Sequence, residues 1–558
     1  MRRKDKINQA IKTGSQEQMK EALDYLLDMK VADFTAGGGS FLRGAFVFLA
    51  DQFKTIYELD LPKNLAEQYP FYSQDDGQYQ WEKYILEHMI YGVDIDYKAV
   101  IISSLTLTLS SLEHHPKDSK LPQLIGRTLI HQNALINSVP YYKRKEVFSK
   151  YKKDIAKLIK LKREDFVAFN KLRKKLQDKV ISNVGEISKE ASFLHIEAIE
   201  LNLPEIYFNE DGSLNEKGGM DVVVGNPPWE KWKPADDDFF NPYAPDVFTD
   251  RKKVKKQVKE QAKRKVLQNS RIKEKYEQYK ERYALGSKYF KDDNNYRYQS
   301  WKVNNKSTGG DRNLYILALE RFTQLAKPDL DAAILVPDNL VTDAGTTGIR
   351  HLLFDNYRVN EFLSFDNNKK IFKAVDSRYK FAVLAFDGEE RSTSELKTFF
   401  YKRDLEDLNK ESEKIPYSID IIKKYSPEEY ALFEPKDIDE YHAYIKIRNR
   451  FNPLKESNLF KLGRDFDKSI DSKLFKSYNK DKDNLVPLYE GKFMHQFVIK
   501  PDEITEGIDR KVVANKIGDD LNEYRLAIRT IASATNMRTL VATLLPPMKL
   551  VYQINYSI

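Results

Sequence analysis

Short apolar runs that end in turns recur along the chain. Residues 221–225 read Asp-Val-Val-Val-Gly, residues 332–337 read Ala-Ala-Ile-Leu-Val-Pro, and residues 381–386 read Phe-Ala-Val-Leu-Ala-Phe. Runs of this length, bounded by turn residues, are typical of buried strands. Between residues 31 and 136 such runs alternate with helical patterns. This alternation predicts an α/β protein with a doubly wound sheet.

The same periodicity predicts how the chain is divided. Residues 1–30 are predicted to form one amphipathic N-terminal helix. Residues 31–387 are predicted to form an α/β domain, with helical insertions rich in Lys and Glu at about 142–192 and 237–310. Residues 388–480 are charged and rich in Tyr, and over residues 388–558 we expect an irregular and mainly helical connector.

Composition narrows the class of protein. The 558 residues include 92 Lys and Arg against 84 Asp and Glu, a net charge of +8 that is compatible with a nucleic-acid partner. The sequence has no cysteine, which excludes disulfides, thiolate zinc sites and cysteine nucleophiles. It has no apolar run long enough to span a membrane, and its charged start lacks the apolar stretch of a signal peptide. We therefore expect a cytoplasmic enzyme with no membrane partner.

The most informative motif is Asn226-Pro227-Pro228-Trp229, which directly follows the strand predicted at 221–225. Two successive prolines cannot continue a strand ladder, so they fix a rigid loop at the carboxyl end of the strand, where open α/β sheets bind ligands. Asn226 offers an amide donor and a carbonyl acceptor, and Trp229 offers a flat face for a base. The motif is therefore suited to holding the exocyclic amine of a base.

Two further motifs lie at predicted strand ends. Residues 31–42 read Val-Ala-Asp-Phe-Thr-Ala-Gly-Gly-Gly-Ser-Phe-Leu, a strand, a glycine turn and a helix start. Glycines allow the backbone to approach a ligand, and a helix start presents free N–H groups. The turn lacks the Gly-Lys-Ser/Thr ending of a phosphate loop. Residues 90–96, Ile-Tyr-Gly-Val-Asp-Ile-Asp, predict a strand ending on acids that can bind ribose hydroxyls.

In this order, the motifs resemble those of DNA amino-methyltransferases that use S-adenosylmethionine. The resemblance extends to Val336-Pro337-Asp338 and to residues 365–381, 489–497 and 534–539. These segments are similar to parts of the large adenine methyltransferases of Type IIG restriction enzymes and of BREX phage-defence systems. The resemblance implies a Rossmann-like, seven-stranded methyltransferase sheet and a site-specific, adenine-specific DNA methyltransferase. Its partners would be double-stranded DNA and a specificity subunit or other defence-system proteins.

The resemblance also implies a chemistry for the Asn-Pro-Pro-Trp loop. A methyl group would pass from S-adenosylmethionine, with no metal, to N6 of an adenine flipped out of the duplex. The side-chain oxygen of Asn226 and the main-chain carbonyl of Pro227 would accept hydrogen bonds from the target amine, in a loop that Pro228 makes rigid. Trp229 would stack on one face of the base and Phe372 on the other, with a core residue as the alternative for Phe372.

For the cofactor, the resemblance implies a second set of residues. Asp33 would orient the ammonium group, and Asp94 would bind the ribose hydroxyls, with Asp96 as the alternative. The remaining members of this set are Gly37, Gly39 and Phe41 at the glycine loop, and Ile95 and Asn133 around the cofactor adenine. As a lone residue, Asn133 could instead be a turn residue.

Three departures from the family pattern keep alternatives open. Phe34 replaces the usual proline, and no Tyr-Thr-Pro segment is visible upstream of the glycine loop. The family places a target-recognition domain after the position of Pro547, and we expect that domain to be missing or vestigial here. A DNA-binding or scaffold subunit, a cytosine-N4 methyltransferase, and methylation of RNA or protein are the competing hypotheses. The basic residues at 250–285 could contact a DNA backbone or form a helix with i,i+4 ion pairs.

Overall fold

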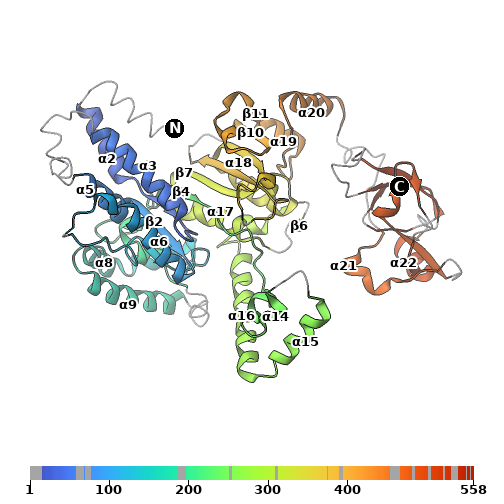
Figure 1. The fold of residues 1–558 in the computed structure, drawn as a ribbon, viewed down its shortest axis with the longest axis horizontal. Coiled ribbons are helices and arrows are strands. Elements are labelled where there is room, and N and C mark those ends of the chain that lie inside the picture. The colour runs from blue at the N-terminus through green and yellow to red at the C-terminus, as the bar shows by residue number, and fades with distance from the viewer. Residues whose placement is uncertain are drawn as a thin grey trace. The chain divides into compact units, whose positions relative to one another are not determined.

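The computed structural model describes residues 16–57, 68, 77–117, 119–184, 196–249, 254–303, 305–307, 312–373, 375–388, 394–452, 465–479, 484–500, 504–518, 522–529, 538, 540–547, 550–552 and 554–557. The chain divides into two compact units, residues 1–441 and 442–558, which are described separately (Figure 1). Within the described ranges, every helix is too short or too polar to cross a lipid bilayer.

The first unit is built on a mixed sheet. Its strands, in spatial order, are β11 (Ile415–Ser418), β10 (Glu395–Lys402), β8 (Arg358–Asp366), β9 (Lys380–Asp387), β7 (Ala326–Pro337), β4 (Met220–Gly225), β1 (Val31–Asp33), β2 (Ile90–Asp94) and β3 (Leu129–His131). The strands from β7 to β3 are parallel to one another, and β9 runs antiparallel to both of its neighbours. The predicted α/β class is confirmed.

The sheet has nine strands among the described residues, where seven were expected. The two extra strands, β10 and β11, lie in the stretch after residue 387 that we expected to be irregular. β10 pairs in parallel with β8, and β11 pairs antiparallel with β10. This pairing joins segments that are distant in sequence, and a local apolar pattern contains no information about it.

The helices of this unit connect and cover the strands. They include α2 (Gln16–Asp28), α3 (Ser40–Tyr57), α5 (Gly77–Tyr84), α6 (Tyr97–Ser110), α17 (Leu314–Leu325), α18 (Thr347–Asn356) and α19 (Ile419–Tyr425). Helix α20 (Ile438–Arg450) begins in this unit and ends in the second. The core beside β1 and β2 buries Leu23 and Leu26 of α2 together with Leu42, Phe46 and Phe53 of α3. Of the N-terminal helix expected at residues 1–30, residues 1–15 lie outside the described part.

Both predicted insertions contain helices. The first holds α7 (Arg144–Ser149), α8 (Lys152–Glu164) and α9 (Phe166–Val184), followed by α11 (Ile199–Asn202) and α12 (Pro204–Tyr207). The second holds α13 (Asp236–Phe240), α14 (Pro245–Phe248), α15 (Lys256–Val266) and α16 (Ser270–Lys291), and then the short hairpin β5 (Lys302–Val303) and β6 (Lys306–Ser307). Figure 1 shows α14, α15 and α16 as an arm that extends away from the sheet.

The second unit corrects the expectation of a mainly helical connector. Its described elements include more strands than helices. The strands are β12 (Lys476–Ser477), β13 (Leu485–Glu490), β14 (Met494–His495), β15 (Val498–Ile499), β16 (Glu506–Asp509), β17 (Arg525–Arg529), β18 (Ala542–Leu545), β19 (Leu550–Tyr552) and β20 (Ile554–Ser557). Besides the end of α20, its α-helices among the described residues are α21 (Lys468–Asp471) and α22 (Arg510–Ile517). The sheet partners of β13 are β16 and β19, so non-local pairing determines these strands. Apart from Arg538, the motif at residues 534–539 lies outside the described residues.

Candidate active site

The three predicted motifs meet at one edge of the sheet. Asp33 pairs with Gly92 across β1 and β2, while Ala32 pairs with Val223 across β1 and β4, and all three strands are parallel. Their carboxyl ends therefore point the same way. The strand order reverses at the β1–β4 boundary, because β2 and β3 continue on one side of β1 and β4 lies on the other. Such a switch point is where open α/β sheets bind ligands.

The glycine loop is held against β2 and α6 by hydrogen bonds. Ala36 N–H donates to the Val93 carbonyl at 3.0 Å, and Gly37 N–H donates to Asp94 Oδ2 at 2.8 Å. The Ser103 hydroxyl donates to the Gly37 carbonyl at 2.9 Å. Gly37 and Gly39 have φ angles of +53° and +81°, in the left-handed region that favours glycine. A Cβ atom at Gly39 would also lie 2.8 Å from Ser103 Oγ, whereas one at Gly37 would meet no atom within 4 Å.

Asp33 is a buried acid at the end of β1, with 1% of its surface exposed. Its Oδ1 accepts hydrogen bonds from the Thr35 N–H at 2.9 Å and from the Thr35 hydroxyl at 3.3 Å. Burial raises the pKa of Asp33 to about 7, and the nearby charge of Asp94 acts in the same direction, while the Thr35 hydrogen bonds oppose the shift. A cationic group beside Asp33 would therefore favour its ionised form.

Gly225, the last residue of β4, lies directly against Asp33. A Cβ atom at position 225 would stand 2.7 Å from Asp33 Oδ1 and 3.1 Å from its carboxyl carbon. Because Asn226 is the next residue, this contact links the glycine-loop strand to the Asn-Pro-Pro-Trp loop. The absence of a side chain at Gly225 is what allows the two motifs to lie together.

The two acids after β2 have different surroundings. Asp94 is half-buried and accepts hydrogen bonds at both oxygens, from Gly37 N–H to Oδ2 and from Asp96 N–H to Oδ1, each at 2.8 Å. Asp96 is exposed and caps α6 by accepting from Lys98 N–H at 2.9 Å. Asp94 thus belongs to the glycine-loop network, and Asp96 has a structural task at a helix start. Ile95, between them, is 41% exposed.

Asn133 closes a turn, which was the alternative for it in the sequence, and Phe41 lies at an apolar cavity that the sequence did not indicate. Asn133 is buried after β3, and its side-chain oxygen accepts from the N–H groups of Leu135 and Ile136 at 2.9 and 3.2 Å. That oxygen closes a turn, so the side-chain NH2 is the part suited to a ligand. Phe41 is half-buried and lines an apolar cavity of about 490 Å³ that strand β4 also lines.

The Asn-Pro-Pro-Trp loop combines exposed and buried side chains. Asn226 and Pro228 are exposed, Pro227 is buried, and Trp229 is half-buried. Trp229 and Phe372 pack against the same apolar cluster, whose buried members are Leu363, Phe365, Phe381 and Phe399. The structure therefore brings together the two aromatic residues predicted to stack on a base. Among the residues that the structure describes, no group accepts a hydrogen bond from the buried Trp229 indole N–H.

Asn367 organises the loop that carries Phe372. It is fully buried, and its side chain accepts from Phe372 N–H at 3.0 Å and donates to the carbonyls of Phe372 and Val375, both at 3.1 Å. The Phe372 ring packs edge-on against Phe381, with ring centroids 4.8 Å apart. The sequence analysis noted Asn367 within a motif but assigned it no role. An asparagine just after a strand was the available signal, because its side chain commonly bonds the following backbone.

Trp232, three residues after Trp229, packs against helix α16 of the helical arm. Its role was not predicted from the sequence. Its indole N–H donates to the Tyr283 carbonyl of α16 at 2.9 Å, and its ring packs edge-on against Phe290, 5.2 Å between centroids. A Cβ atom at Gly286 would collide with the Trp232 ring. The isolated glycine inside a helical pattern was the signal, since such a glycine often marks a close approach.

A charged cluster lies at the same edge of the sheet, where β7, the neighbour of β4, ends. Asp338, after β7, accepts from the Ser364 hydroxyl at 3.2 Å and lies 3.4 Å from Lys380 Nζ, which is also 3.4 Å from Glu434. Burial raises the pKa of Asp338, and the charge of Lys380 opposes that shift. Lys380 also lies over the Tyr401 ring, 4.3 Å from its centroid. No role for Asp338 was predicted from the sequence.

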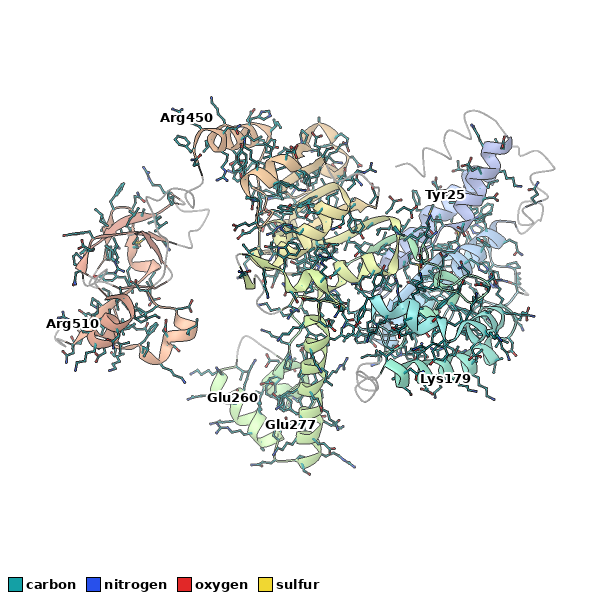
Figure 2. All side chains as sticks on the ribbon, turned by 180° about the vertical axis from the view of Figure 1, so that it is seen from behind. Tyr25, Lys179, Glu260, Glu277, Arg450 and Arg510 are labelled. Atoms are coloured by element: carbon teal, nitrogen blue, oxygen red, sulfur yellow. The ribbon has the colours of Figure 1, made fainter. Side chains whose placement is uncertain are left out.

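The helical arm has internal ion pairs and an apolar core, whose buried members are Phe240, Phe248 and Tyr276. Lys259 and Lys263 of α15 pair with Asp237 and Asp236 of α13 at 2.9 and 2.6 Å, rather than along their own helix. Other basic side chains of the arm are exposed, namely Lys255, Lys256, Arg264, Lys265, Arg271, Lys273 and Lys275. Figure 2 shows side chains standing outward from this arm around Glu260 and Glu277. Across all described residues, no group of three or more His, Asp or Glu side chains is arranged to hold a metal ion.

Comparisons with known proteins were made for the sequence and for the structure. The sequence model described as Eco57I restriction-modification methylase matches residues 88–372, just over half of the chain. A search of curated proteins finds no match. Similar solved structures are a nuclease-deletion mutant of the Type ISP restriction-modification enzyme LlaGI with a DNA substrate mimic (9% identity, TM-score 0.48) and the Type IIL enzyme MmeI with DNA (8%, 0.44). A third is described as a modification subunit of a type I restriction enzyme from Vibrio vulnificus YJ016 (11%, 0.31).

These matches cover most of this chain and only part of the others. The alignments include 95%, 100% and 79% of this chain, respectively. They include 39% of the LlaGI chain, 60% of the MmeI chain and 53% of the Vibrio chain. The chain therefore spans about two fifths to three fifths of the length of these structures.

Proposed function

Because the chain belongs to the Eco57I restriction-modification methylase family, we propose that it is a DNA methyltransferase that uses S-adenosylmethionine. The proposed product is N6-methyladenine, made on a base flipped out of the duplex. The biological setting would be the modification arm of a restriction or phage-defence system. The observation that carries the proposal is the contact of Asp33 with Gly225, which places a buried acid of the glycine loop beside Asn226.

The residues around the glycine loop fit this cofactor. Asp33 is a buried acid that an ammonium group would stabilise in its ionised form. Open space above Gly37 leaves room for a ligand close to the backbone. Asp94 lies beside Gly37 and would bind the ribose hydroxyls, and Ile95 is exposed enough to pack on the cofactor adenine. The NH2 group of Asn133 would reach that adenine, while Gly39 shapes the loop.

When bound, S-adenosylmethionine supplies an activated methyl group on its sulfonium. The chain's own task is to make the target amine nucleophilic and to hold it still. Acceptance of hydrogen bonds by the Asn226 side-chain oxygen and the Pro227 carbonyl would draw the amine lone pair out of conjugation with the ring. No general base is required before attack, because the proton can leave afterwards. Positioning and preorganised polar groups then provide much of the rate.

The flipped base needs a surface that replaces the stacking it loses. Trp229 and Phe372 belong to one apolar cluster, and Asn367 fixes the loop of Phe372 through three hydrogen bonds. Stacking of a base on an aromatic side chain contributes about 1–3 kcal/mol. Both aromatic side chains are half-buried, so part of each remains available to a base.

Methylated-base analysis tests this function. DNA from cells that express the chain should contain N6-methyladenine, and DNA from cells that express the Asn226→Ala variant at the same level should not. N4-methylcytosine in place of N6-methyladenine would reassign the target base and keep the reaction class. If the purified chain binds S-adenosylmethionine and DNA but modifies neither base with any accompanying subunit, the catalytic proposal is wrong and a scaffold role replaces it.

A further inference from the structure

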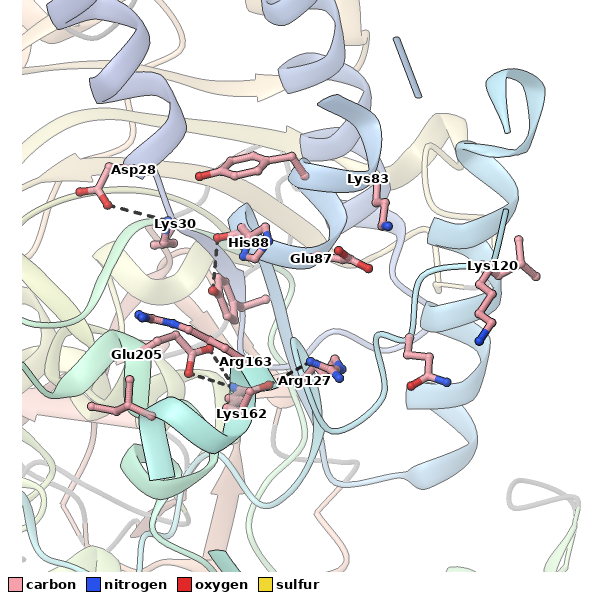
Figure 3. A pocket seen from close by; sticks show the side chains of 15 residues that line it. Asp28, Lys30, Lys83, Glu87, His88, Lys120, Arg127, Lys162, Arg163 and Glu205 are labelled. Atoms are coloured by element: carbon pink, nitrogen blue, oxygen red, sulfur yellow. Dashed lines mark hydrogen bonds and ion pairs between the residues drawn. The ribbon is translucent and has the colours of Figure 1, made fainter. Parts of the chain in front are cut away.

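A second cavity lies at the sheet edge opposite to the candidate active site. It has a volume of about 790 Å³ and is lined by residues near the amino ends of the parallel strands (Figure 3). Lys30 precedes β1, His88 precedes β2, and Arg127 precedes β3, whereas the glycine loop and Asn226 follow the carboxyl ends of β1 and β4. The cavity is thus separated from the active site by the length of the strands.

The lining of this cavity is mainly cationic. Its basic side chains are Lys30, Lys83, Lys120, Arg127, Lys162 and Arg163, and its acidic ones are Asp28, Glu87 and Glu205. Six basic groups lie against three acids in the lining, and Arg163 also pairs with Glu210 outside it, so a smaller net positive formal charge remains within the concave surface. Low-dielectric walls around a cavity of one sign of charge focus the field on a ligand of opposite sign. The lining therefore selects for an anion.

One ion pair forms the floor of the cavity. Lys162 is only 7% exposed, and its Nζ donates to both Glu205 oxygens, at 2.8 and 3.0 Å, and to the Asn202 carbonyl at 2.9 Å. All three Nζ donors of Lys162 are used in this way. This lysine and Glu205 are neutralised by each other, so the anion must be held by other cations.

Arg127 is pre-oriented for that purpose. Its guanidinium lies 4.2 Å from the centroid of the Phe166 ring, and one of its nitrogens donates to the Lys162 carbonyl at 3.1 Å. A guanidinium has five N–H donors in a rigid fork, so this single bond leaves donors that match a phosphate group. Lys83 adds a further positive charge. Lys30 also lines the cavity, with its Nζ 3.9 Å from Asp28, and burial lowers the pKa of Lys30 while the charge of Asp28 opposes that shift.

Between α5 and β2, the cavity wall is formed by an irregular helical turn and by two ring side chains. Residues Ile85–Met89 form a π-helical turn, a rare element that is frequent at functional sites. The turn places His88 in the lining, with its ring 4.8 Å from that of Tyr84. The Tyr91 hydroxyl donates to the His88 carbonyl at 3.2 Å and fixes the other side of the turn. Tyr84 and His88 offer ring surfaces beside the cationic groups.

We propose that this cavity binds a nucleoside phosphate, with its phosphates at Arg127, Lys83 and Lys30 and its base against Tyr84 and His88. The chemistry of the lining combines phosphate donors with aromatic surfaces, and the volume lies in the range of about 300–1,000 Å³ that small-molecule sites occupy. The site is distinct from the one proposed for methyl transfer and does not depend on it.

Calorimetry on the full chain with ADP as the probe tests the proposal. ADP should bind, and Lys83→Gln and Arg127→Gln should each weaken it by tenfold or more. Lys157→Gln is the matched control, because Lys157 is exposed on α8 and does not line the cavity, and it should leave the affinity unchanged. Thermal unfolding of each variant checks its fold, and Lys83→Gln keeps the test valid if loss of the Arg127–Lys162 bond destabilises the other variant.

Two further measurements separate this cavity from other sources of binding. Saturating S-adenosylhomocysteine should not displace ADP, since an adenosine group could otherwise enter the cofactor site. Inorganic pyrophosphate should bind at least tenfold more weakly than ADP, because it lacks a base. Displacement by S-adenosylhomocysteine, or retention of full ADP affinity in Lys83→Gln and Arg127→Gln, would overturn the site. Equal affinity for pyrophosphate would overturn the nucleoside assignment.

Discussion

The carboxylate of Asp33 lies so close to Gly225 that a single added Cβ atom would stand 2.7 Å from Asp33 Oδ1. Real Cβ atoms essentially never approach an oxygen this closely. The carboxylate cannot simply turn away, because both the N–H and the hydroxyl of Thr35 bond its Oδ1. This contact couples the glycine loop to the Asn-Pro-Pro-Trp loop through the backbone of adjacent parallel strands.

Gly225→Ala tests that coupling. The new methyl group should displace Asp33 and weaken S-adenosylmethionine by at least tenfold, with methyl transfer reduced further because Asn226 shifts too. Gly44→Ala is the control, since a Cβ atom at Gly44 in helix α3 would meet no atom within 4 Å. That change should stabilise the helix by roughly 0.5–1 kcal/mol. Calorimetry and thermal unfolding compare the two variants, and equal cofactor affinities would disprove the coupling.

Asn226→Ala should abolish methyl transfer and leave S-adenosylmethionine affinity within a few-fold of the unchanged protein. The reason is that Asn226 is exposed at the loop and, in the proposed mechanism, contacts only the target amine. Asn209→Ala, in an exposed turn that precedes β4, controls for the loss of an asparagine side chain. Radiolabelled methyl transfer and calorimetry should be measured together. Transfer within a few-fold of the unchanged protein would remove Asn226 from the catalytic role.

Asp94→Ala should mainly lower cofactor affinity, whereas Asp96→Ala should mainly lower stability. Asp94→Ala removes the acceptor of the Gly37 and Asp96 N–H groups as well as the proposed ribose ligand, so cofactor affinity should fall more than tenfold. Asp96→Ala removes a helix cap, which costs about 0.5–2 kcal/mol of stability, and should leave affinity nearly unchanged. Cofactor titration and thermal unfolding of both variants separate the two effects. A larger loss of affinity in Asp96→Ala would move the ribose role to Asp96.

Asp33 should make cofactor binding depend on pH. Burial raises its pKa to about 7, so the free protein holds Asp33 mostly protonated at pH 6 and mostly ionised at pH 7.5. An ammonium group prefers the ionised form, and affinity should rise about fivefold to tenfold over that interval. The Asp33→Asn variant should bind more weakly and show a flat profile. A profile in Asp33→Asn as steep as that of the unchanged protein would assign the titration to another group.

The same shift has a consequence for stability. The native pKa of about 7 exceeds the ordinary value of 3.8, so between these values the native state binds more protons at this site than the unfolded state does. The contribution of Asp33 to stability therefore decreases as pH rises from about 4 to 7 and is constant above that range. Thermal unfolding of the ligand-free protein should show a smaller decrease over this range in Asp33→Asn than in the unchanged chain.

DNA binding should depend steeply on salt through the exposed basic residues of the helical arm. Replacing Lys256, Arg264 and Lys265 of α15 by glutamine should reduce the salt dependence, by a slope of about 0.9 for each lost phosphate contact. The matched control replaces Lys153, Lys157 and Lys160 of α8, which are equally exposed. Fluorescence anisotropy with one duplex at several salt concentrations measures both slopes. Identical slopes would place the DNA contacts outside the arm.

The sequence by itself determined the local parts of this protein. The strands that end at Asp33, at Asp94 and just before Asn226 could be predicted, because an apolar run followed by turn residues is a local signal. Candidate chemistry followed from the same residues, since glycine and successive prolines each restrict the backbone in a known way. The roles of these residues at a site stay predictions until the variants are measured.

Only the tertiary structure decided which of these parts meet. The contact of Asp33 with Gly225, the seat of Trp232 against α16, and the cavity around Arg127 join residues that are far apart in sequence. The same is true of β10, β11 and the strands of the second unit, which were expected to be irregular or helical. The physical reason is that strand pairing and cavity shape depend on long-range packing, for which periodicity within a short window contains no information.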